Sequence, residues 1–135
     1  MSQENVQAVE RVLATLRYAS PGEFTDALLG ELFAPEIEWL PVARGSLADR
    51  YTGYEGIRRF FADFLGTWNE FDAQVRGFRE VGDHVVTTLR VTGHGERVSL
   101  DESWSALWRI ENDRVVRMEG FATLSGASEA LGLEE

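Results

Sequence analysis

The first half of the chain carries hydrophobic residues at helical spacing, and the second half carries them at alternate positions. The first half predicts one helix over Ser2–Tyr18 and a second that begins at the capping sequence Ser20-Pro21-Gly22-Glu23. Pro35 should end the second helix near Phe33, because the residue before a proline avoids helical backbone. The alternating residues that follow predict a short strand over Glu36–Val42.

The clearest helical pattern spans Tyr54–Trp68. Its apolar face carries residues at i, i+3, i+4, i+7, i+8 and i+11, namely Ile57, Phe60, Phe61, Phe64, Leu65 and Trp68. So wide an apolar face has to pack against a sheet. The loop before this helix, residues 43–53, has no packing period and is long enough to form a lid or the rim of a pocket.

The remaining residues predict strands joined by tight turns. Alternation begins at Phe71–Val75, and Gly77-Phe78 breaks its phase as a β-bulge does. Long strands follow over His84–Thr92 and Leu100–Glu111, and a last strand follows the two-residue turn Asn112-Asp113. A short helix over Ser125–Leu131, capped by Thr123 or by Ser125 itself, ends the chain.

This order of elements predicts an α+β fold in a single domain of residues 1–135. Helices come first and antiparallel strands last, whereas a parallel α/β fold would alternate the two. The strands are long, so the sheet must twist and curl strongly. Helices across the concave face of such a sheet would enclose a cone-shaped internal pocket.

The last hairpin, Trp104–Thr123, has the most unusual residue pattern. A two-residue turn pairs Trp104 with Phe121, Ala106 with Glu119, Trp108 with Arg117 and Ile110 with Val115. These side chains would share one face of the sheet, because strand side chains alternate with period two. Glu119 would then stand on an apolar face opposite a small alanine, with space above it.

Two roles for Glu119 follow from that position. Desolvation among aromatic side chains would raise its pKa toward the range of a general base, and Arg90 on a nearby strand would stabilise an oxyanion. Alternatively, Glu119 forms a structural ion pair with Arg90 or with Arg117. If the turn differs from this prediction by one residue, Glu119 lies outside the pocket and cannot have the catalytic role.

A second group of side chains is expected to bind the ligand: Trp39, Tyr54, His94, Glu102, Trp104, Trp108 and Phe121. Glu102 shares the phase of Trp104 along its strand. His94 stands between two glycines, either as an acid or base at the cavity mouth or as an ordinary turn histidine. Trp39 and Tyr54 are either cavity walls or core residues.

The charge and composition of the chain exclude some classes of partner and of chemistry. The net charge of −10 accompanies thirteen arginines and no lysine, which excludes Schiff-base chemistry by lysine and disfavours nucleic acid and anionic membranes. The absence of cysteine removes thiolate nucleophiles and Cys-based metal sites. His84 and His94 would be about 33 Å apart on one strand and could not share a metal. No metal or cofactor is expected, and the absence of signal-peptide and membrane-helix patterns favours the cytoplasm.

Two stretches resemble the SnoaL-like (polyketide cyclase-like) group of NTF2-like proteins. Residues 51–61 (YTGYEGIRRFF) are similar to that group's Gly-x-Glu-x-Ile-x-x-Phe helix start, and residues 106–117 (ALWRIENDRVVR) resemble its hairpin; Glu129–Leu133 also fits. The resemblance implies a cone-shaped fold and a homodimer. The superfamily contains cyclases, isomerases, epoxide hydrolases and non-enzymatic binding proteins.

The general bases of that superfamily are missing at the matching positions. Thr123 stands where the resemblance places the aspartate of the cyclases, and Leu40 stands where ketosteroid isomerases carry theirs. Arg90 matches the arginine of limonene epoxide hydrolase-like enzymes, and it would point inward together with Thr92 if its strand keeps the family register. Thr92 replaces the aspartate that those enzymes carry two residues later. Ala106 occupies a position where many relatives have aspartate or histidine.

Three functions are consistent with these observations. The first is an acid/base enzyme (isomerase, cyclase or hydrolase) that acts on a small hydrophobic molecule, with Glu119 as base and Arg90 as electrostatic helper. The second is a non-catalytic module that binds a hydrophobic ligand, and the third is a dimerisation domain. The outer sheet face also reads as apolar and predicts a homodimer formed through it; its expected residues are Leu107, which would face Met118, and nearby Ser105, Gly120, Val116, Leu89 and Val91.

Overall fold

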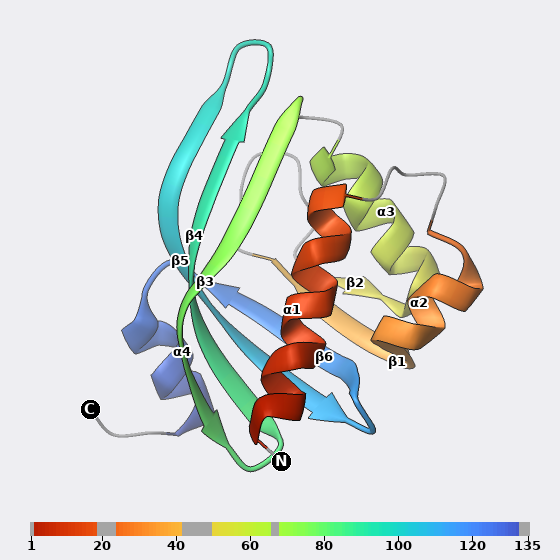
Figure 1. The fold of residues 1–135 in the computed structure, drawn as a ribbon, viewed down its shortest axis with the longest axis vertical. Helices are drawn as coiled ribbons and strands as arrows, with labels where there is room; N and C mark the ends of the chain where they lie inside the picture. Colours follow the sequence, from red (N-terminus) through yellow and green to blue (C-terminus); the bar gives the residue numbers. More distant parts are fainter. Residues whose placement is uncertain (1, 19–23, 42–49, 66–67, 133–135) are drawn as a thin grey trace.

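A computed structural model describes residues 2–18, 24–41, 50–65 and 68–132 of the chain. The described residues form α1 (Ser2–Tyr18), α2 (Asp26–Leu32), β1 (Phe33–Leu40), β2 (Tyr51–Thr52), α3 (Gly53–Leu65), β3 (Glu70–Val81), β4 (His84–His94), β5 (Ser99–Glu111), β6 (Arg114–Phe121) and α4 (Leu124–Leu131) (Figure 1). The predicted order is confirmed, with the short strand β2 added before α3. The loop predicted as a lid, residues 43–53, lies mostly outside the described residues.

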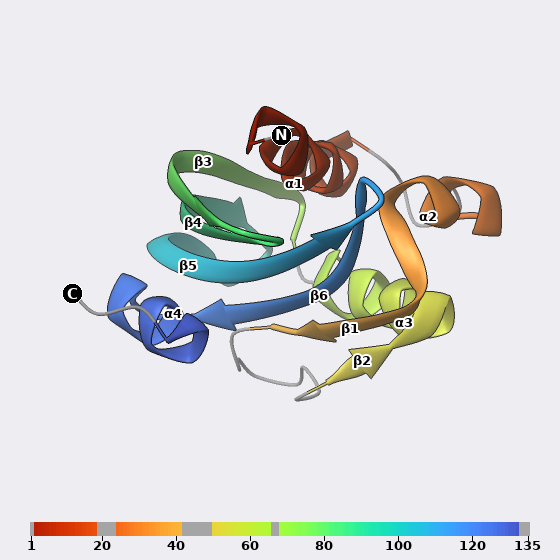
Figure 2. The same ribbon diagram turned by 90° about the horizontal axis from the view of Figure 1, so that it is seen from below.

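The six strands belong to one curved mixed sheet, in the order β2-β1-β6-β5-β4-β3. β1 runs parallel to β6, and the other neighbouring pairs are antiparallel. The long strands β3, β4 and β5 curl, and α1 and α3 lie on the concave side of the sheet (Figures 1 and 2). This arrangement confirms the predicted α+β fold, in which a strongly curved sheet wraps around helices.

Local signals set the helix ends, with one difference from the prediction. The capping sequence predicted at residues 20–23 lies outside the described residues, and α2 itself begins at Asp26. There the Thr25 side chain accepts a hydrogen bond from the Leu28 amide at 3.2 Å, as an N-cap does. Thr123, one of the two predicted caps of α4, accepts a hydrogen bond from the Gly126 amide at 3.1 Å.

Two β-bulges in the antiparallel strand pairs determine which side chains face inward. The bulge predicted in β3 is confirmed between Val75 and Gly77. The second bulge was not predicted and lies in β6. Ile110 pairs with Val115, but Arg109 pairs with Arg117, so Val116 is an extra residue.

The predicted turn of the last hairpin is correct, but the register beyond the second bulge is wrong by one residue. Asn112 and Asp113 have φ angles of 53° and 64°, which a two-residue type I′ turn requires. The observed pairs beyond Val116 are Trp108 with Met118, Leu107 with Glu119, Ala106 with Gly120 and Ser105 with Phe121. Met118 therefore faces the concave side, and Glu119 and Phe121 face the opposite side.

The convex face of the sheet is partly covered by α4. Leu107 and Val86 are buried there with Ala127 of the helix, and Phe121 packs against them. Figure 2 shows α4 beside β5 and β6. The residues that were expected to extend this apolar face, Leu89, Val91, Met118 and Gly120, lie instead on the concave side. The apolar outer face predicted as a dimer surface is thus smaller than expected and is covered by the chain's own helix.

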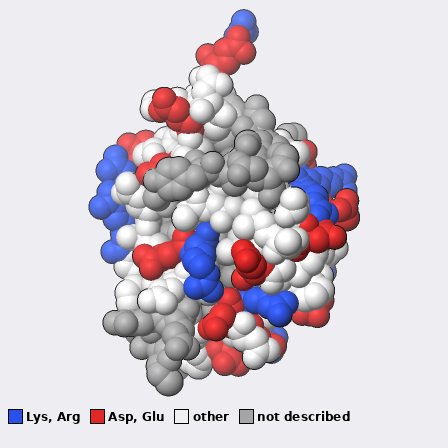
Figure 3. Space-filling view, turned by 45° about the vertical axis from the view of Figure 1, so that its right-hand side comes forward, with Lys and Arg blue, Asp and Glu red and all other residues white. Residues whose placement is uncertain are grey.

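The charged side chains are dispersed. Figure 3 shows one face of the molecule, on which acidic and basic side chains are interspersed rather than separated by sign. Several form ion pairs, such as Arg50 with Glu38 at 3.5 Å and Arg58 with both Asp26 and Glu55. These pairs neutralise part of the acidic excess locally.

Gly93 offers a test of the packing at the upper end of the sheet. A Cβ atom at Gly93 would lie 2.8 Å from Cε3 of Trp68, whose ring also contacts Phe64 and Phe71. We expect Gly93→Ala to lower the free energy of unfolding by about 1–3 kcal/mol, because the indole must move. Urea denaturation followed by tryptophan fluorescence measures the change.

Gly77→Ala is the matched control for that substitution. A Cβ at Gly77 meets no atom within 4 Å among the described residues, so its effect should be near zero. Equal destabilisation by the two variants would contradict the proposed contact with Trp68.

Candidate functional site

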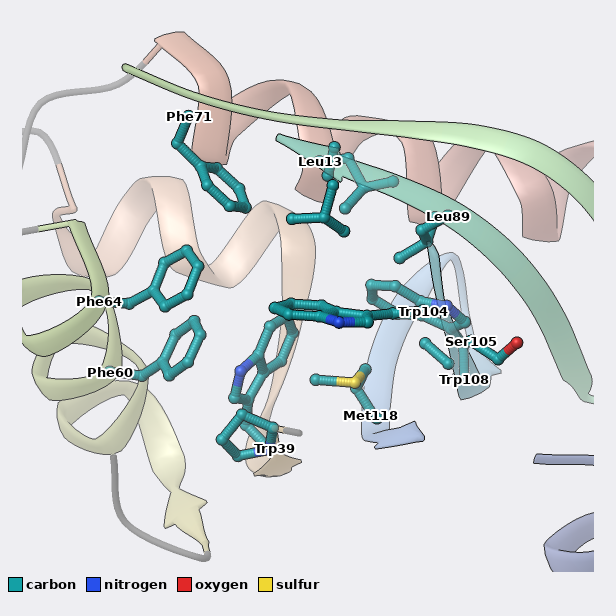
Figure 4. Close-up of a pocket in the computed structure, with 15 residues that line it drawn as sticks. Leu13, Trp39, Phe60, Phe64, Phe71, Leu89, Trp104, Ser105, Trp108 and Met118 are labelled. Carbon is teal, nitrogen blue, oxygen red and sulfur yellow. The ribbon is translucent and has the colours of Figure 1, made fainter. Parts of the chain in front are cut away.

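An apolar cavity of about 70 Å³ lies between the concave face of the sheet and the helices (Figure 4). Its walls come from α1, α3 and five strands: Leu13, Trp39, Pro41, Phe60, Phe64, Phe71, Ala73, Leu89, Val91, Trp104, Ser105, Ala106, Trp108, Met118 and Gly120. The alternating inward positions of β3, β4, β5 and β6 supply most of them. The cavity is therefore a consequence of sheet curvature and strand register together.

Aromatic rings form much of the wall. Trp39 lies in the middle, with its ring centroid 5.3 Å from that of Phe60 and 5.9 Å from that of Trp108. Phe60 and Phe64 stack at 5.4 Å, and Phe64 meets Phe71 edge to face at 4.7 Å. Such contacts stabilise the wall beyond simple area burial and hold the rings in defined orientations.

Few polar groups belong to this wall. The indole N–H of Trp108 donates to Oγ1 of buried Thr87 at 2.9 Å, and that of Trp104 donates to Oε1 of Glu102 at 2.8 Å. Ser105 lies in the wall, but Figure 4 shows its hydroxyl pointing away from the cavity. Among the described residues, no Asp, Glu, His, Arg or Tyr lines the cavity.

Glu119, the predicted general base, lies on the opposite side of the sheet from the cavity. It pairs across the strands with Leu107, and its carboxylate accepts a hydrogen bond from Arg117 at 3.1 Å. Arg117 also contacts Glu38 at 3.5 Å, and the Glu119 side chain is 30% exposed. The predicted pairing with Ala106 is wrong, and of the two roles considered the geometry matches the ion pair with Arg117.

Arg90, the predicted electrostatic helper, also faces outward. It pairs with Ser103 across the strands and binds Asp101 through two hydrogen bonds of 3.0 and 3.2 Å. The prediction that it points inward is wrong, because Leu89 and Val91 occupy the inward positions of β4. Arg90 and Glu119 are therefore not brought together at the cavity.

Only some of the seven predicted ligand-binding residues lie at the cavity. Trp39, Trp104 and Trp108 line the cavity, and Glu102 lies one inward position beyond Trp104. Tyr54 donates from its hydroxyl to the Phe33 carbonyl at 3.0 Å. His94 is exposed at the end of β4, and Phe121 packs on the convex face.

Of the remaining wall residues, Phe60 and Phe64 were expected as core, because periodicity alone does not distinguish a cavity wall from a filled core. Leu89, Val91, Met118 and Gly120 were expected on the outer sheet face and line the cavity instead. Met118 was missed because the bulge at Val116 was missed.

Within residues 2–18, 24–41, 50–65 and 68–132, no group of three His, Asp or Glu residues is placed to bind a metal. In the same ranges no helix has both the length and the apolarity needed to span a membrane.

A family model described as the SnoaL-like domain matches residues 9–118. The chain belongs to this family. The comparison with curated proteins gives no match. At the position where the resemblance expects the aspartate of the SnoaL-like cyclases, this member has Thr123, whose side chain caps α4.

Solved structures with low sequence identity share the SnoaL-like fold. A hypothetical protein with a ketosteroid isomerase-like fold from Catenulispora acidiphila is 21% identical, with 94% of this chain and 93% of that chain covered and a TM-score of 0.71. Bal32a, from a soil-derived mobile gene cassette, is 24% identical, with 94% and 95% covered and a TM-score of 0.74. A putative SnoaL-like polyketide cyclase from Jannaschia is 19% identical, with 98% and 94% covered and a TM-score of 0.71.

The observed register of β6 predicts losses of stability of different size for two adjacent substitutions. Met118→Ala removes a buried side chain, and we expect it to lower the free energy of unfolding by about 2–4 kcal/mol. Glu119→Ala removes a partly exposed ion pair, and we expect a loss of less than about 1 kcal/mol. Urea denaturation of both variants measures the difference, and a larger effect at Glu119 would contradict the bulge at Val116.

The Arg90–Asp101 pair predicts a pH-dependent contribution to stability. Hydrogen bonds and charge attraction from Arg90 hold the pKa of Asp101 below its usual value in the folded protein. The stabilisation is therefore present above the unfolded-state pKa, about 3.9, and is lost as pH falls through the lower folded pKa. Asp101→Asn should lower the melting temperature slightly near pH 7 and have less effect below about pH 4.

A double-mutant cycle provides the control for this pair. In an Arg90→Gln background, Asp101→Asn should lose its pH-dependent effect, as measured by thermal unfolding at several pH values. Both side chains are largely exposed, at 49% and 63%, so added salt should also weaken the effect. If Asp101→Asn kept its full pH-dependent effect in the Arg90→Gln background, the lowered pKa of Asp101 would be caused by another group.

Proposed function

We propose that this SnoaL-like domain is a non-catalytic binding protein whose cavity takes a small, uncharged and largely apolar molecule. The observation that carries the proposal is the absence of ionisable side chains from the cavity wall formed by the described residues. Acid/base catalysis needs a titratable group within hydrogen-bond reach of the reacting atom. Hydrophobic transfer into an aromatic-lined cavity needs no such group.

The same wall selects against charged ligands. A carboxylate or ammonium group in this cavity would lose its hydration without gaining an ionic partner from the described wall residues. The free volume of about 70 Å³ favours a molecule with few heavy atoms, or a larger one that displaces wall side chains. Size and polarity thus point to small hydrocarbons and their uncharged derivatives.

The known structures of this fold are consistent with a small-molecule ligand. The Catenulispora protein was crystallised in complex with trimethylamine. The Jannaschia protein is described as a putative polyketide cyclase, so an acid/base enzyme is the second candidate function. Geometry favours binding over that candidate, because Glu119 and Arg90 lie on the convex face.

Homodimer formation through the convex face and a cytoplasmic location stay predictions from the sequence. The resemblance still favours a dimer, but α4 covers part of the apolar area on which the surface argument rested. Size-exclusion chromatography with light scattering would decide the oligomeric state.

Filling the cavity should abolish ligand binding. Methylenecyclopentane is a suitable probe, because it is uncharged, apolar and small. We expect Ala106→Leu to weaken its binding about tenfold or more, because the larger side chain occupies the space between Trp104 and Trp108. Ligand-observed NMR and the ligand-induced rise in melting temperature measure the change.

Ala62→Leu, at an exposed position of α3, is the matched control and should leave binding unchanged. Met118→Ala enlarges the cavity and should allow toluene to bind more tightly than it does to the wild type. Unchanged binding of methylenecyclopentane to Ala106→Leu would refute the cavity as its site. Chemical turnover of a bound ligand would refute the non-catalytic assignment.

A further inference from the structure

The four tryptophans fall into two groups by the state of their indole N–H. Those of Trp104 and Trp108 donate to Glu102 and Thr87. Those of Trp39 and Trp68 are buried and have no hydrogen-bond partner among the described residues. Of these two tryptophans, Trp39 lines the cavity and Trp68 does not.

The Trp39 N–H is packed against the ring of Phe60, another residue of the cavity wall. The residue is 3% exposed and lies on β1 between Phe60 and Trp108. Figure 4 shows its indole nitrogen on the ring edge that faces Phe60, and both of these rings line the cavity. An aromatic ring is a weak acceptor, so a buried N–H that faces one keeps most of its desolvation cost.

We propose that Trp39 Nε1 is the specificity-determining donor of this cavity and that the natural ligand carries one uncharged acceptor oxygen, as in a ketone, ester or ether, on a small apolar frame. This inference rests on the proposed binding function and adds the ligand class to it. The centroids of Trp39 and Phe60 are 5.3 Å apart, so a ligand oxygen has to displace the Phe60 ring to accept from the indole N–H, which folding alone leaves unpaired.

The rest of the wall explains why the acceptor should be single and uncharged. The indole N–H groups of Trp104 and Trp108 are already committed to protein oxygens. The hydroxyl of Ser105 points away from the cavity (Figure 4). A carboxylate ligand would find no cation among the described wall residues to offset its desolvation.

The test compares two molecules of nearly the same shape, cyclopentanone and methylenecyclopentane. In ¹⁵N–¹H spectra of the wild type, four indole signals are expected from the four tryptophans. Cyclopentanone should move the Trp39 N–H signal downfield, because its oxygen accepts a hydrogen bond, whereas methylenecyclopentane should not. Trp39→Phe assigns that signal by its loss.

Affinities give a second readout that does not depend on spectral assignment. The two probes differ in hydration, so the quantity to compare is the ratio of their dissociation constants, alkene over ketone. This ratio should fall about tenfold in Trp39→Phe, the size expected for one neutral hydrogen bond. It should stay unchanged in Trp68→Phe, which removes the other unpartnered N–H but no wall residue.

The outcomes separate this inference from the proposed function. If both probes bind and the Trp39 signal does not respond to the ketone, the N–H is only a packing feature beside Phe60. The inference is then wrong, and the binding function stands. If neither probe binds, both are wrong. The wild-type spectra decide the matter even if Trp39→Phe fails to fold.

Discussion

The cavity depends on one extra residue in β6. The bulge at Val116 shifts the strand by one position, so that Met118 and Gly120 face the helices and Arg117 and Glu119 face outward. Without the bulge, a glutamate and an arginine would lie among Trp104, Trp108 and Trp39. Desolvation of each charge there costs roughly several kcal/mol unless the two are fully paired. With it, the two charges join Glu38 in a partly exposed ion-pair network.

The same bulge positions the neighbouring parallel strand. Downstream of it, Trp39 pairs with Met118 and Leu40 with Glu119, so the register of β6 also places Trp39 beside the cavity. Trp39 then forms ring contacts with Phe33, Phe60, Phe61 and Trp108. The apolar character of the site depends on the bulge in β6, and the placement of its unpaired donor depends on that bulge together with the register shift between Phe33 and Glu38 in β1.

Most of the fold was predictable because its signals are local. Helical spacing located α1 and α3, and a glycine marked the bulge in β3. The bulge in β6 contains no glycine or proline to mark it. Its only signal was a conflict: the turn places Val115 inward, and strict alternation would then put the charged Arg117 and Glu119 inward and the apolar Val116 and Met118 outward. For β4, the apolar phase of Leu89 and Val91 was the correct guide, and the register borrowed from the family was not. The unpaired state of Trp39 could not be predicted, because it depends on the packing of several elements.

The energetics of Trp39 bear on the choice between a filled core and a binding site. Four aromatic contacts at about 0.5–1.5 kcal/mol each stabilise the indole by roughly 2–6 kcal/mol, which can offset the roughly 1–3 kcal/mol cost of an unsatisfied buried N–H. The fold therefore tolerates the unpaired donor. A phenylalanine at this position would keep much of the ring packing without that cost. An indole beside an otherwise apolar cavity is thus better explained by a ligand acceptor than by stability, and a hydrogen bond that orients a ligand needs no general base.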